Sequence, residues 1–286
     1  MDGAKRNPGN ATLKRPPPWR GGSKSFTDKG DFALILDRFN LTGKVALVTG
    51  SSRGLGAGIA LALAEAGASV AVHGSSRMPE DTLQQLAALG APTLGLVGDV
   101  GDPKDCALLV SETVARFGAI DILVNNAGTI RRAPAVDHPD EYWQAVIDVN
   151  LSSVFRLMQH AGRHMLKQGS GKIINIASML TFQGGINVPS YAAAKGGVGQ
   201  LTKAFANEWA GRGVNVNAIA PGYMATDNTA ALQADPLRSR QILERIPAGR
   251  WGIPEDLAGA AVFLASPASD YIHGHIMVVD GGWLAR

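Results

Sequence analysis

The sequence lacks the cysteines of a disulfide scaffold, since its 286 residues include only Cys106. A single cysteine has no partner within its own chain, so we expect a reducing compartment such as the cytoplasm. Long apolar runs are lacking as well. The run GAAVFLAS at 259–266 is far too short to span a bilayer, so no membrane segment is expected. With 45% hydrophobic residues, the chain is long enough for one large domain with a sizeable core.

Excess positive charge is absent from most of the chain. Residues 1–30 carry seven Lys or Arg and two acidic residues, whereas the rest carries 20 Lys or Arg against 22 Asp or Glu. The basic character therefore belongs to a tail, and no nucleic-acid partner is expected. The tail is rich in Pro, Gly and charge, so we predict a disordered basic extension over 1–34. A solvated spacer is its simplest role, with a transit peptide or a polyproline ligand as alternatives.

Short apolar runs alternate with helical patterns over residues 35–286. Runs that are apolar on both faces are typical of strands buried in a parallel sheet, and the helices between them predict crossover connections. We therefore predict one α/β domain, a doubly wound parallel sheet of the Rossmann type with helices on both faces. The runs are KVALVTG (44–50), SVAVHG (69–74), TLGLVGDV (93–100), IDILVNNAG (120–128), GKIINIAS (171–178), VNVNAIAPG (214–222) and HIMVVDGG (275–282).

The first strand leads into the loop TGSSRGLG, residues 49–56, and then into a helix. Glycines in such a loop permit a tight turn and a close approach of the backbone to a ligand. The start of the helix offers unpaired N–H groups and the positive end of the helix dipole to a pyrophosphate. This loop predicts a dinucleotide site that includes Gly50, Ser52, Arg53, Gly54, Leu55 and Gly56.

Tyr191 and Lys195 stand four residues apart in SYAAAKGGVGQL, residues 190–201. On a helix this spacing places the phenol and the ammonium on one face. A phenol that works near neutral pH needs its pKa lowered by about three units, or about 4 kcal/mol. An ammonium at roughly 4 Å supplies about that much at an effective dielectric near 20. The pair is thus a candidate for proton transfer, although the spacing by itself is also typical of a surface pair.

Five features taken together resemble the short-chain dehydrogenase/reductase family over residues 41–286. They are TGxxxGxG (49–56), NNAG (125–128), Ser178, the YxxxK of 191–195, and PG (221–222). The resemblance implies an NAD(P)-dependent enzyme that interconverts a secondary alcohol and a ketone. It implies that Tyr191 is the general acid/base, that Ser178 holds the substrate oxygen, and that Lys195 also binds the cofactor ribose.

The resemblance also assigns residues outside these five features. Asn150, within a predicted long helix at 140–166, would hold a water molecule of a proton relay. The alternative for Asn150 is a hydrogen bond to a local carbonyl group. The further cofactor residues that the resemblance implies are Asp99, Val100, Asn126, Ala127, Gly128, Pro221, Gly222 and Thr226.

The second strand ends without an acidic residue. An acid at that position binds the ribose 2′-hydroxyl of NAD and repels a 2′-phosphate, and the position falls on Gly74. Ser75, Ser76 and Arg77 follow, and Arg53 adds a second cation from the glycine loop. We therefore predict that NADP(H) is favoured and that NAD(H) remains possible. The alternative is that both arginines are solvated surface charges.

Four longer segments resemble, within the family, the dehydrogenases of 2-dehydro-3-deoxy-D-gluconate and 2-deoxy-D-gluconate. The segments are 171–198, 217–229, 246–257 and 279–286. A keto-deoxy sugar acid is then the expected substrate. A 3-oxoacyl-carrier-protein reductase or a gluconate 5-dehydrogenase is the alternative enzyme, and a non-catalytic dinucleotide-binding regulator is the remote alternative.

A pair of arginines follows the fourth strand in TIRRAP, residues 129–134. Loops at the carboxyl ends of parallel strands open toward the crevice, where an arginine can hold a carboxylate. Adjacent residues of an extended loop point in opposite directions, so one of the two is expected to face the site. A solvated pair or an intersubunit salt bridge is the alternative. The predicted substrate residues are Arg131, Arg132, Ser178, Gln183 and Tyr191.

No metal site is predicted. His160 and His164 lie four residues apart, but no Glu stands between them in an H-E-x-x-H frame, so a helix surface or a subunit contact is the better interpretation. Cys106 is interpreted as a packing residue. The family resemblance further suggests a homotetramer, with residues 281–286 near a subunit interface.

Overall fold

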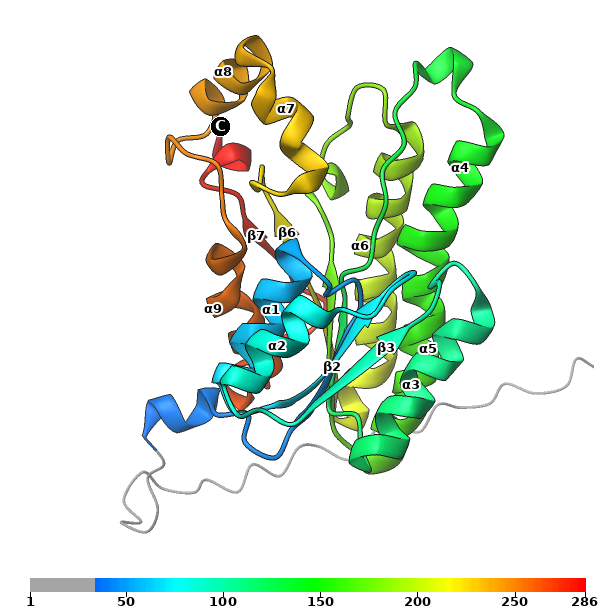
Figure 1. Ribbon diagram of the computed structural model, residues 1–286, viewed down its shortest axis with the longest axis vertical. Helices are drawn as coiled ribbons and strands as arrows, with labels where there is room; N and C mark the ends of the chain where they lie inside the picture. The colour runs from blue at the N-terminus through cyan, green and yellow to red at the C-terminus, as the bar shows by residue number, and fades with distance from the viewer. Residues whose placement is uncertain (1–33) are drawn as a thin grey trace, which may run out of the picture. The chain divides into compact units, whose positions relative to one another are not determined.

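The computed structural model describes residues 34–286, and residues 35–286 form one unit. The predicted extension over 1–34 therefore lies outside the described residues, except for Leu34. The sheet has seven parallel strands in the order β3-β2-β1-β4-β5-β6-β7 (Figure 1). The predicted doubly wound parallel sheet is confirmed. The strands are β1 (Val45–Val48), β2 (Ser69–Gly74), β3 (Thr93–Val97), β4 (Ile122–Asn125), β5 (Gly171–Ile176), β6 (Val214–Pro221) and β7 (Ile276–Val279).

Helices cover both faces of the sheet. One face carries α1, α2 and α9, and the other carries α3, α5 and α6 (Figure 1). Along β1, Val48 packs into the first layer and Leu47 into the second, and both are fully buried. This explains why the strands are continuous apolar runs in the sequence. The helices are α1 (Gly54–Glu65), α2 (Glu80–Ala88), α3 (Pro103–Phe117), α4 (Asp140–Ile147), α5 (Ser153–Gln168), α6 (Pro189–Trp209), α7 (Ala230–Ala234), α8 (Pro236–Arg245) and α9 (Ala258–Ala265).

The strand order reverses between β1 and β4. The chain winds outward from β1 to β3, returns to β4, and then winds outward to β7 on the other side. Ligands of such sheets bind in the crevice at this switch point, beyond the carboxyl ends of the strands. The short helices α7 and α8 lie beyond the same ends of β6 and β7, close to the C-terminus of the chain (Figure 1).

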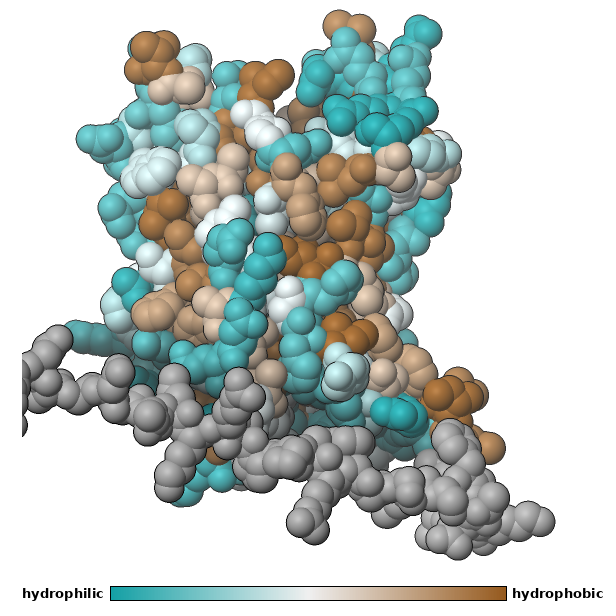
Figure 2. Space-filling view, turned by 180° about the vertical axis from the view of Figure 1, so that it is seen from behind, coloured by the Kyte–Doolittle hydropathy of each residue, from teal (hydrophilic) through white to brown (hydrophobic). Residues whose placement is uncertain are grey.

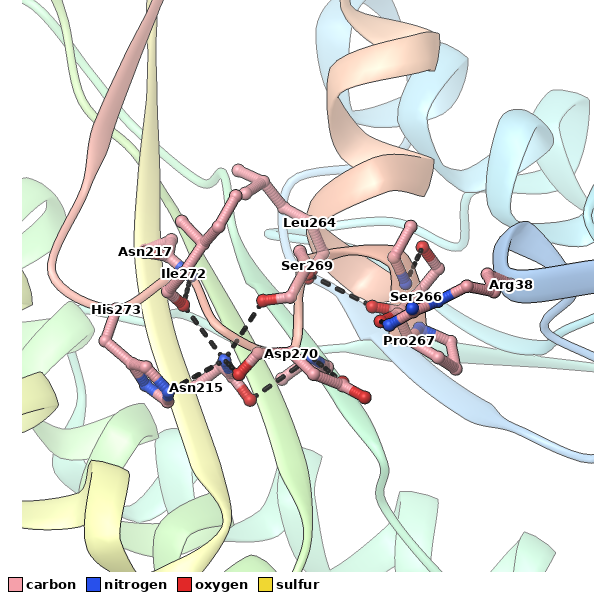
Figure 3. Close-up of polar contacts among 12 residues, drawn as sticks. Arg38, Asn215, Asn217, Leu264, Ser266, Pro267, Ser269, Asp270, Ile272 and His273 are labelled. Atoms are coloured by element: carbon pink, nitrogen blue, oxygen red, sulfur yellow. Dashed lines mark hydrogen bonds and ion pairs between the residues drawn. The ribbon is translucent and has the colours of Figure 1, made fainter. Parts of the chain in front are cut away.

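A polar network at the opposite end of the sheet joins the start of β6 to the turn after α9 (Figure 3). The side-chain nitrogen of buried Asn215 donates to the Ile272 carbonyl at 2.9 Å and lies 3.0 Å from the Asp270 carbonyl. Its side-chain oxygen accepts from the Lys172 ammonium at 3.1 Å, and that ammonium pairs with the Asp270 carboxylate at 2.7 Å. One side chain thus satisfies several backbone groups of the turn that leads into β7.

Replacing Asn215 should therefore destabilise the fold without affecting the carboxyl ends of the strands. We expect Asn215→Ala to lower the free energy of unfolding by about 1–3 kcal/mol, because the carbonyl groups of the turn lose their donor. Urea denaturation measures the change, with Asn207→Ala on the exposed face of α6 as the control. Equal midpoints for the two variants would contradict the role assigned to Asn215.

Candidate active site

A cleft of about 1280 Å³ opens at the carboxyl ends of the strands. Figure 2 shows the molecule from behind, with its upper edge hollowed between two lobes. Every residue that the sequence predicted for the cofactor, the substrate or catalysis lines this cleft, except Arg77 and Pro221. Pro221 ends β6 as a buried residue paired with Val279, and the exposed Arg77 belongs to the loop before α2. The cofactor contacts of these two residues stay a prediction.

The glycine loop can turn this tightly only because Gly50 and Gly56 have no side chains. A Cβ at Gly50, whose φ is +62°, would lie 2.7 Å from the Ala127 Cα, and a Cβ at Gly56 would overlap the Gly50 carbonyl. Arg53 precedes α1 in an extended conformation and makes no side-chain hydrogen bond to the first turn. The first N–H groups of α1 can therefore face an anion in the cleft. These features fit the pyrophosphate of a dinucleotide cofactor.

His73 is a site residue that the sequence analysis missed. Its Nδ1 accepts a hydrogen bond from the Gly50 N–H at 3.0 Å, and its Nε2 lies 2.8 Å from the Gly98 carbonyl oxygen. The carbonyl can only accept, so the ring is neutral and carries its proton on Nε2. His73 is buried and joins the glycine loop to the loop after β3. No local sequence pattern marks it, because both partners come from distant parts of the chain.

The backbone at the end of β2 leaves no space for an acidic side chain at Gly74. A Cβ at Gly74 would overlap the Arg77 carbonyl oxygen, so this backbone admits no side chain at that position. Ser75 and Ser76 follow, are exposed and line the cleft. Arg53 also lines the cleft, and its Nε pairs with the Asp227 carboxylate at 2.7 Å.

Ser178, Tyr191 and Lys195 come together in the cleft from two elements. Ser178 follows β5, and its Oγ accepts a hydrogen bond from the Leu180 N–H at 3.1 Å, which fixes the side chain at the start of a short 3-10 turn. Tyr191 stands in the first turn of α6, and Ser178 is near enough to its phenol to lower the phenol pKa. Lys195 lies one turn further on, with 4% of its surface exposed. The predicted spacing therefore does bring the three side chains into one site.

Burial is the largest influence on the pKa values of Tyr191 and Lys195. Burial raises the pKa of Tyr191, and Ser178 and the positive charge of Arg132 oppose this rise. The Lys195 ammonium donates to the Ile176 carbonyl at 2.6 Å and lies 5.6 Å from the centre of the Tyr191 ring. Burial lowers the pKa of Lys195 to about 8. The Lys195 ammonium thus binds the backbone at the end of β5, and a lowering of the phenol pKa by Lys195 stays a prediction.

Asn150 lies in a π-helical turn, Asp148–Ser152, that interrupts the predicted helix between α4 and α5. Its side-chain nitrogen donates to the Thr129 carbonyl at 2.8 Å and to the Val146 carbonyl at 2.9 Å. Its side-chain oxygen accepts from the Thr129 N–H at 3.3 Å. This pattern matches the second of the two alternatives for Asn150, since the buried amide bonds local backbone. The side chain thereby ties the loop after β4 to the π-helical turn.

The two arginines of the loop after β4 are both exposed and both line the cleft. The Arg131 guanidinium turns back to its own loop, at 3.4 Å from Thr129 Oγ1 and 3.4 Å from the Ile130 carbonyl oxygen. Arg132 acts electrostatically on the Tyr191 phenol. Arg132 is therefore the better placed of the pair to meet a negative group of a bound substrate.

Residues 34–286 contain neither a metal-binding cluster nor a helix that could span a membrane. No group of three or more His, Cys, Asp and Glu side chains there is arranged to hold a metal ion. No helix in residues 34–286 combines the length and the apolar character needed to cross a membrane. Cys106 is buried and unpaired, its Sγ donates to the Val100 carbonyl, and burial raises its pKa to about 11.

The chain is similar to proteins that are named as dehydrogenases of sugar acids. A family profile described as enoyl-(acyl carrier protein) reductase matches residues 50–284. The 2-dehydro-3-deoxy-D-gluconate 5-dehydrogenase of Dickeya dadantii (strain 3937) is 56% identical over 254 residues, which is 88% of this chain and 100% of that protein.

Two solved structures give the same picture. A candidate 2-deoxy-D-gluconate 3-dehydrogenase from Agrobacterium tumefaciens with bound NADP is 53% identical, with a TM-score of 0.81 over 87% of this chain and 100% of that one. A gluconate 5-dehydrogenase from Burkholderia cenocepacia J2315, in complex with NADP and tartrate, is 42% identical, with a TM-score of 0.84 over 88% of this chain and 100% of that one.

The bonding of His73 predicts a dependence of stability on pH. A protonated ring would turn an N–H toward the Gly50 N–H, and burial lowers the pKa of His73 below 6.5. The unfolded chain then binds more protons than the folded one below pH 6.5, so the folded state loses stability as the pH falls. On acidification, the free energy of unfolding should fall less for His73→Gln than for the wild type. The difference between the two proteins should grow by at most about 1.4 kcal/mol per pH unit.

Urea denaturation of both proteins at several pH values between 5 and 8 measures this difference. At pH 8 the ring is neutral in both states, so the offset between the two proteins there serves as the control. If the free energies of unfolding of the wild type and His73→Gln changed equally with pH, the assignment of a neutral His73 ring in the folded state would be contradicted.

Proposed function

The chain belongs to the short-chain dehydrogenase/reductase family and is an oxidoreductase, and we propose that it interconverts a secondary alcohol and a ketone on a sugar acid of the 2-dehydro-3-deoxy-D-gluconate type. The observation that carries the proposal is the placing of Ser178, Tyr191 and Lys195 in one cleft whose wall also presents arginines. The name of the Dickeya dadantii relative, at 56% identity, supports this choice of substrate.

The roles of the side chains follow from their protonation states. A half-buried phenol with a raised pKa is protonated at neutral pH, so Tyr191 can donate a proton to a carbonyl oxygen during reduction and take it back during oxidation. The Ser178 hydroxyl lines the same cleft beside the phenol and would hold the same substrate oxygen. Bound NADP(H) supplies or accepts the hydride. The Lys195 ammonium is available to hydroxyl groups of the cofactor ribose.

Tyr191→Phe tests the proton-transfer role. We expect the cofactor Kd to stay near the wild-type value and kcat to fall by about 10²-fold or more, because the ring remains but the acidic hydroxyl is gone. Steady-state kinetics and fluorescence titration with NADPH give the two numbers. Tyr142→Phe, in α4 and outside the cleft, is the control and should keep the wild-type kcat. A wild-type kcat in Tyr191→Phe would contradict the proton-transfer role of Tyr191.

NADP(H) is the cofactor that the end of β2 fits. The backbone at Gly74 excludes the acid that would repel a 2′-phosphate, and the hydroxyls of Ser75 and Ser76 are offered in its place. Arg53 adds a positive charge at the cleft wall, and an ion pair with Asp227 positions its side chain there. Two structural relatives contain bound NADP. NAD(H) remains a weaker second cofactor, because no acid is present to bind the 2′-hydroxyl.

An acid introduced beside the ribose should reverse this preference. We expect Ser75→Asp to lower kcat/KM for NADPH by about tenfold or more and to change kcat/KM for NADH much less, because the carboxylate repels only the 2′-phosphate. Ser111→Asp on α3, outside this cleft, introduces the same charge as a control. A wild-type enzyme that already prefers NADH, or a Ser75→Asp enzyme with an unchanged ratio, would overturn the cofactor assignment.

The acid group of the substrate is assigned to Arg132. Its charge acts at Tyr191, whereas Arg131 is turned back onto its own loop. We expect Arg132→Ala to raise KM for the acid about tenfold or more, since a charge-assisted hydrogen bond contributes about 1.5–3 kcal/mol. The methyl ester of the same acid should bind Arg132→Ala and the wild type about equally.

Arg131→Ala serves as the matched control and should change KM less than Arg132→Ala does. Initial rates with NADP⁺ and 2-dehydro-3-deoxy-D-gluconate provide the comparison. The same assay with 5-keto-D-gluconate and NADPH, and with a 3-oxoacyl thioester and NADPH, separates the sugar-acid activity from the two alternative enzymes. Wild-type KM values for the acid in both variants would contradict the carboxylate role.

We also propose a homotetramer in the cytoplasm. Apolar side chains gather in a band across the middle of the face seen in Figure 2, and a patch of this kind favours contact with another protein surface. The exposed side chains among the described residues include Phe155 and Val278, each 40% exposed. Light scattering after gel filtration measures the assembly, and a monomer would overturn the proposal.

A further inference from the structure

One face of helix α8 forms part of the cleft wall. Arg238, Gln241, Ile242 and Arg245 all line the cleft, and their spacing of three and four residues places them on the same side of the helix. The Arg238 guanidinium is bonded to the Gln241 side-chain oxygen at 2.8 Å. Arg245 has no ion pair among the described residues. A cation in a ligand cleft without an acidic partner is a candidate to bind an anion of the substrate.

Arg245 is nevertheless held in place, by an aromatic ring. Its guanidinium carbon lies 4.0 Å from the centre of the Trp283 ring. Trp283 is only 5% exposed, because it packs against Tyr223, at 4.7 Å between ring centres, and against Ile242 and Ile246 of the α8 segment. A stacked guanidinium keeps its N–H groups at the rim free to bind a carboxylate.

The end of the chain fixes this arrangement from the other side. The Arg286 side chain donates to the Glu244 carbonyl at 2.6 Å and to the Arg245 carbonyl at 3.2 Å, which are carbonyl groups at the end of α8. The Asp280 carboxylate accepts from the N–H groups of Gly282 and Leu284, both at 2.8 Å. Residues 283–286 therefore hold both the side chain and the backbone of Arg245.

We propose that Arg245 is a specificity residue that binds the carboxylate of the substrate, and that Trp283 is the residue that positions it. This inference rests on the sugar-acid activity proposed above. A carboxylate offers about four lone-pair sites, so it can accept from two guanidinium groups at once. Arg132 lies in the loop after β4 and Arg245 at the end of α8, and both line the cleft. A neutral substrate has no use for this pair.

Arg245→Gln tests the binding role directly, because the exposed side chain can be replaced without opening a cavity. We expect KM for 2-dehydro-3-deoxy-D-gluconate with NADP⁺ to rise about tenfold or more, with kcat within about twofold of the wild type. KM for the methyl ester of the same acid and KM for NADP⁺ should stay unchanged. Arg240→Gln is the matched control, since Arg240 lies on the same helix, pairs with Glu244 and does not line the cleft.

Trp283 is tested by a pair of variants that both keep an apolar side chain. Trp283→Phe retains a ring under the guanidinium and should keep KM for the acid close to the wild-type value. Trp283→Leu removes the ring and should raise KM for the acid while leaving kcat and KM for the ester near those of the wild type. Equal KM values for Trp283→Phe and Trp283→Leu, or losses that are the same for acid and ester, would show a merely structural role and overturn the positioning assignment.

The outcomes separate this inference from the function on which it rests. If the wild type oxidises neither the acid nor its ester, the proposed function fails, and the inference fails with it. If the wild type oxidises the acid but Arg245→Gln retains the wild-type KM, the inference alone is overturned. A KM increase in Arg245→Gln that is specific for the acid and absent from Arg240→Gln supports it, whether or not Trp283→Leu folds.

Discussion

The close approach of Gly50 to Ala127 is the contact on which the rest of the site depends. It joins the loops after β1 and β4, the two strands at which the sheet reverses its winding, and it leaves no space for a side chain at Gly50. The Asn126 side chain closes the same junction by donating to the Thr49 and Gly50 carbonyls, both at 2.9 Å. With these loops locked together, the start of α1 and the loop with the arginines keep fixed positions around one cleft.

The two ends of the sheet have different roles: the amino end of β6 carries a stabilising polar network, and the carboxyl ends of the strands form the cleft. At the amino end of β6, the Asn215 side chain binds carbonyl groups of the turn that leads into β7. At the carboxyl ends, backbone N–H groups, hydroxyls and guanidinium groups face open space instead. In the free protein water can bind these groups, and an anionic ligand replaces that water with charge-assisted hydrogen bonds. The cleft is thus suited to anions, both phosphate and carboxylate.

Burial determines the charge states of the reacting groups. Burial raises the pKa of the half-buried Tyr191 phenol and lowers that of the buried Lys195 ammonium, because each change favours the neutral form. Ser178 and Arg132 oppose the rise in the Tyr191 pKa. The two residues that would contact the substrate therefore also lower the pKa of the phenol. Arg132 thus adds positive charge to the cleft wall and also favours the ionised form of Tyr191.

The sequence by itself determined the features that depend on local spacing. The apolar runs predicted the strands, the glycines of 49–56 predicted the loop, and the intervals among Ser178, Tyr191 and Lys195 predicted one site, because each signal lies within a short stretch of chain. It could not reveal His73 or the direction of the Lys195 ammonium, since their partners are Gly98 and the Ile176 carbonyl. The π-helical turn at Asn150 and the stack of Arg245 on Trp283 also join residues far apart in sequence. Only tertiary packing decides which distant groups meet, because burial and hydrogen bonding act through space and leave no fixed interval in the chain.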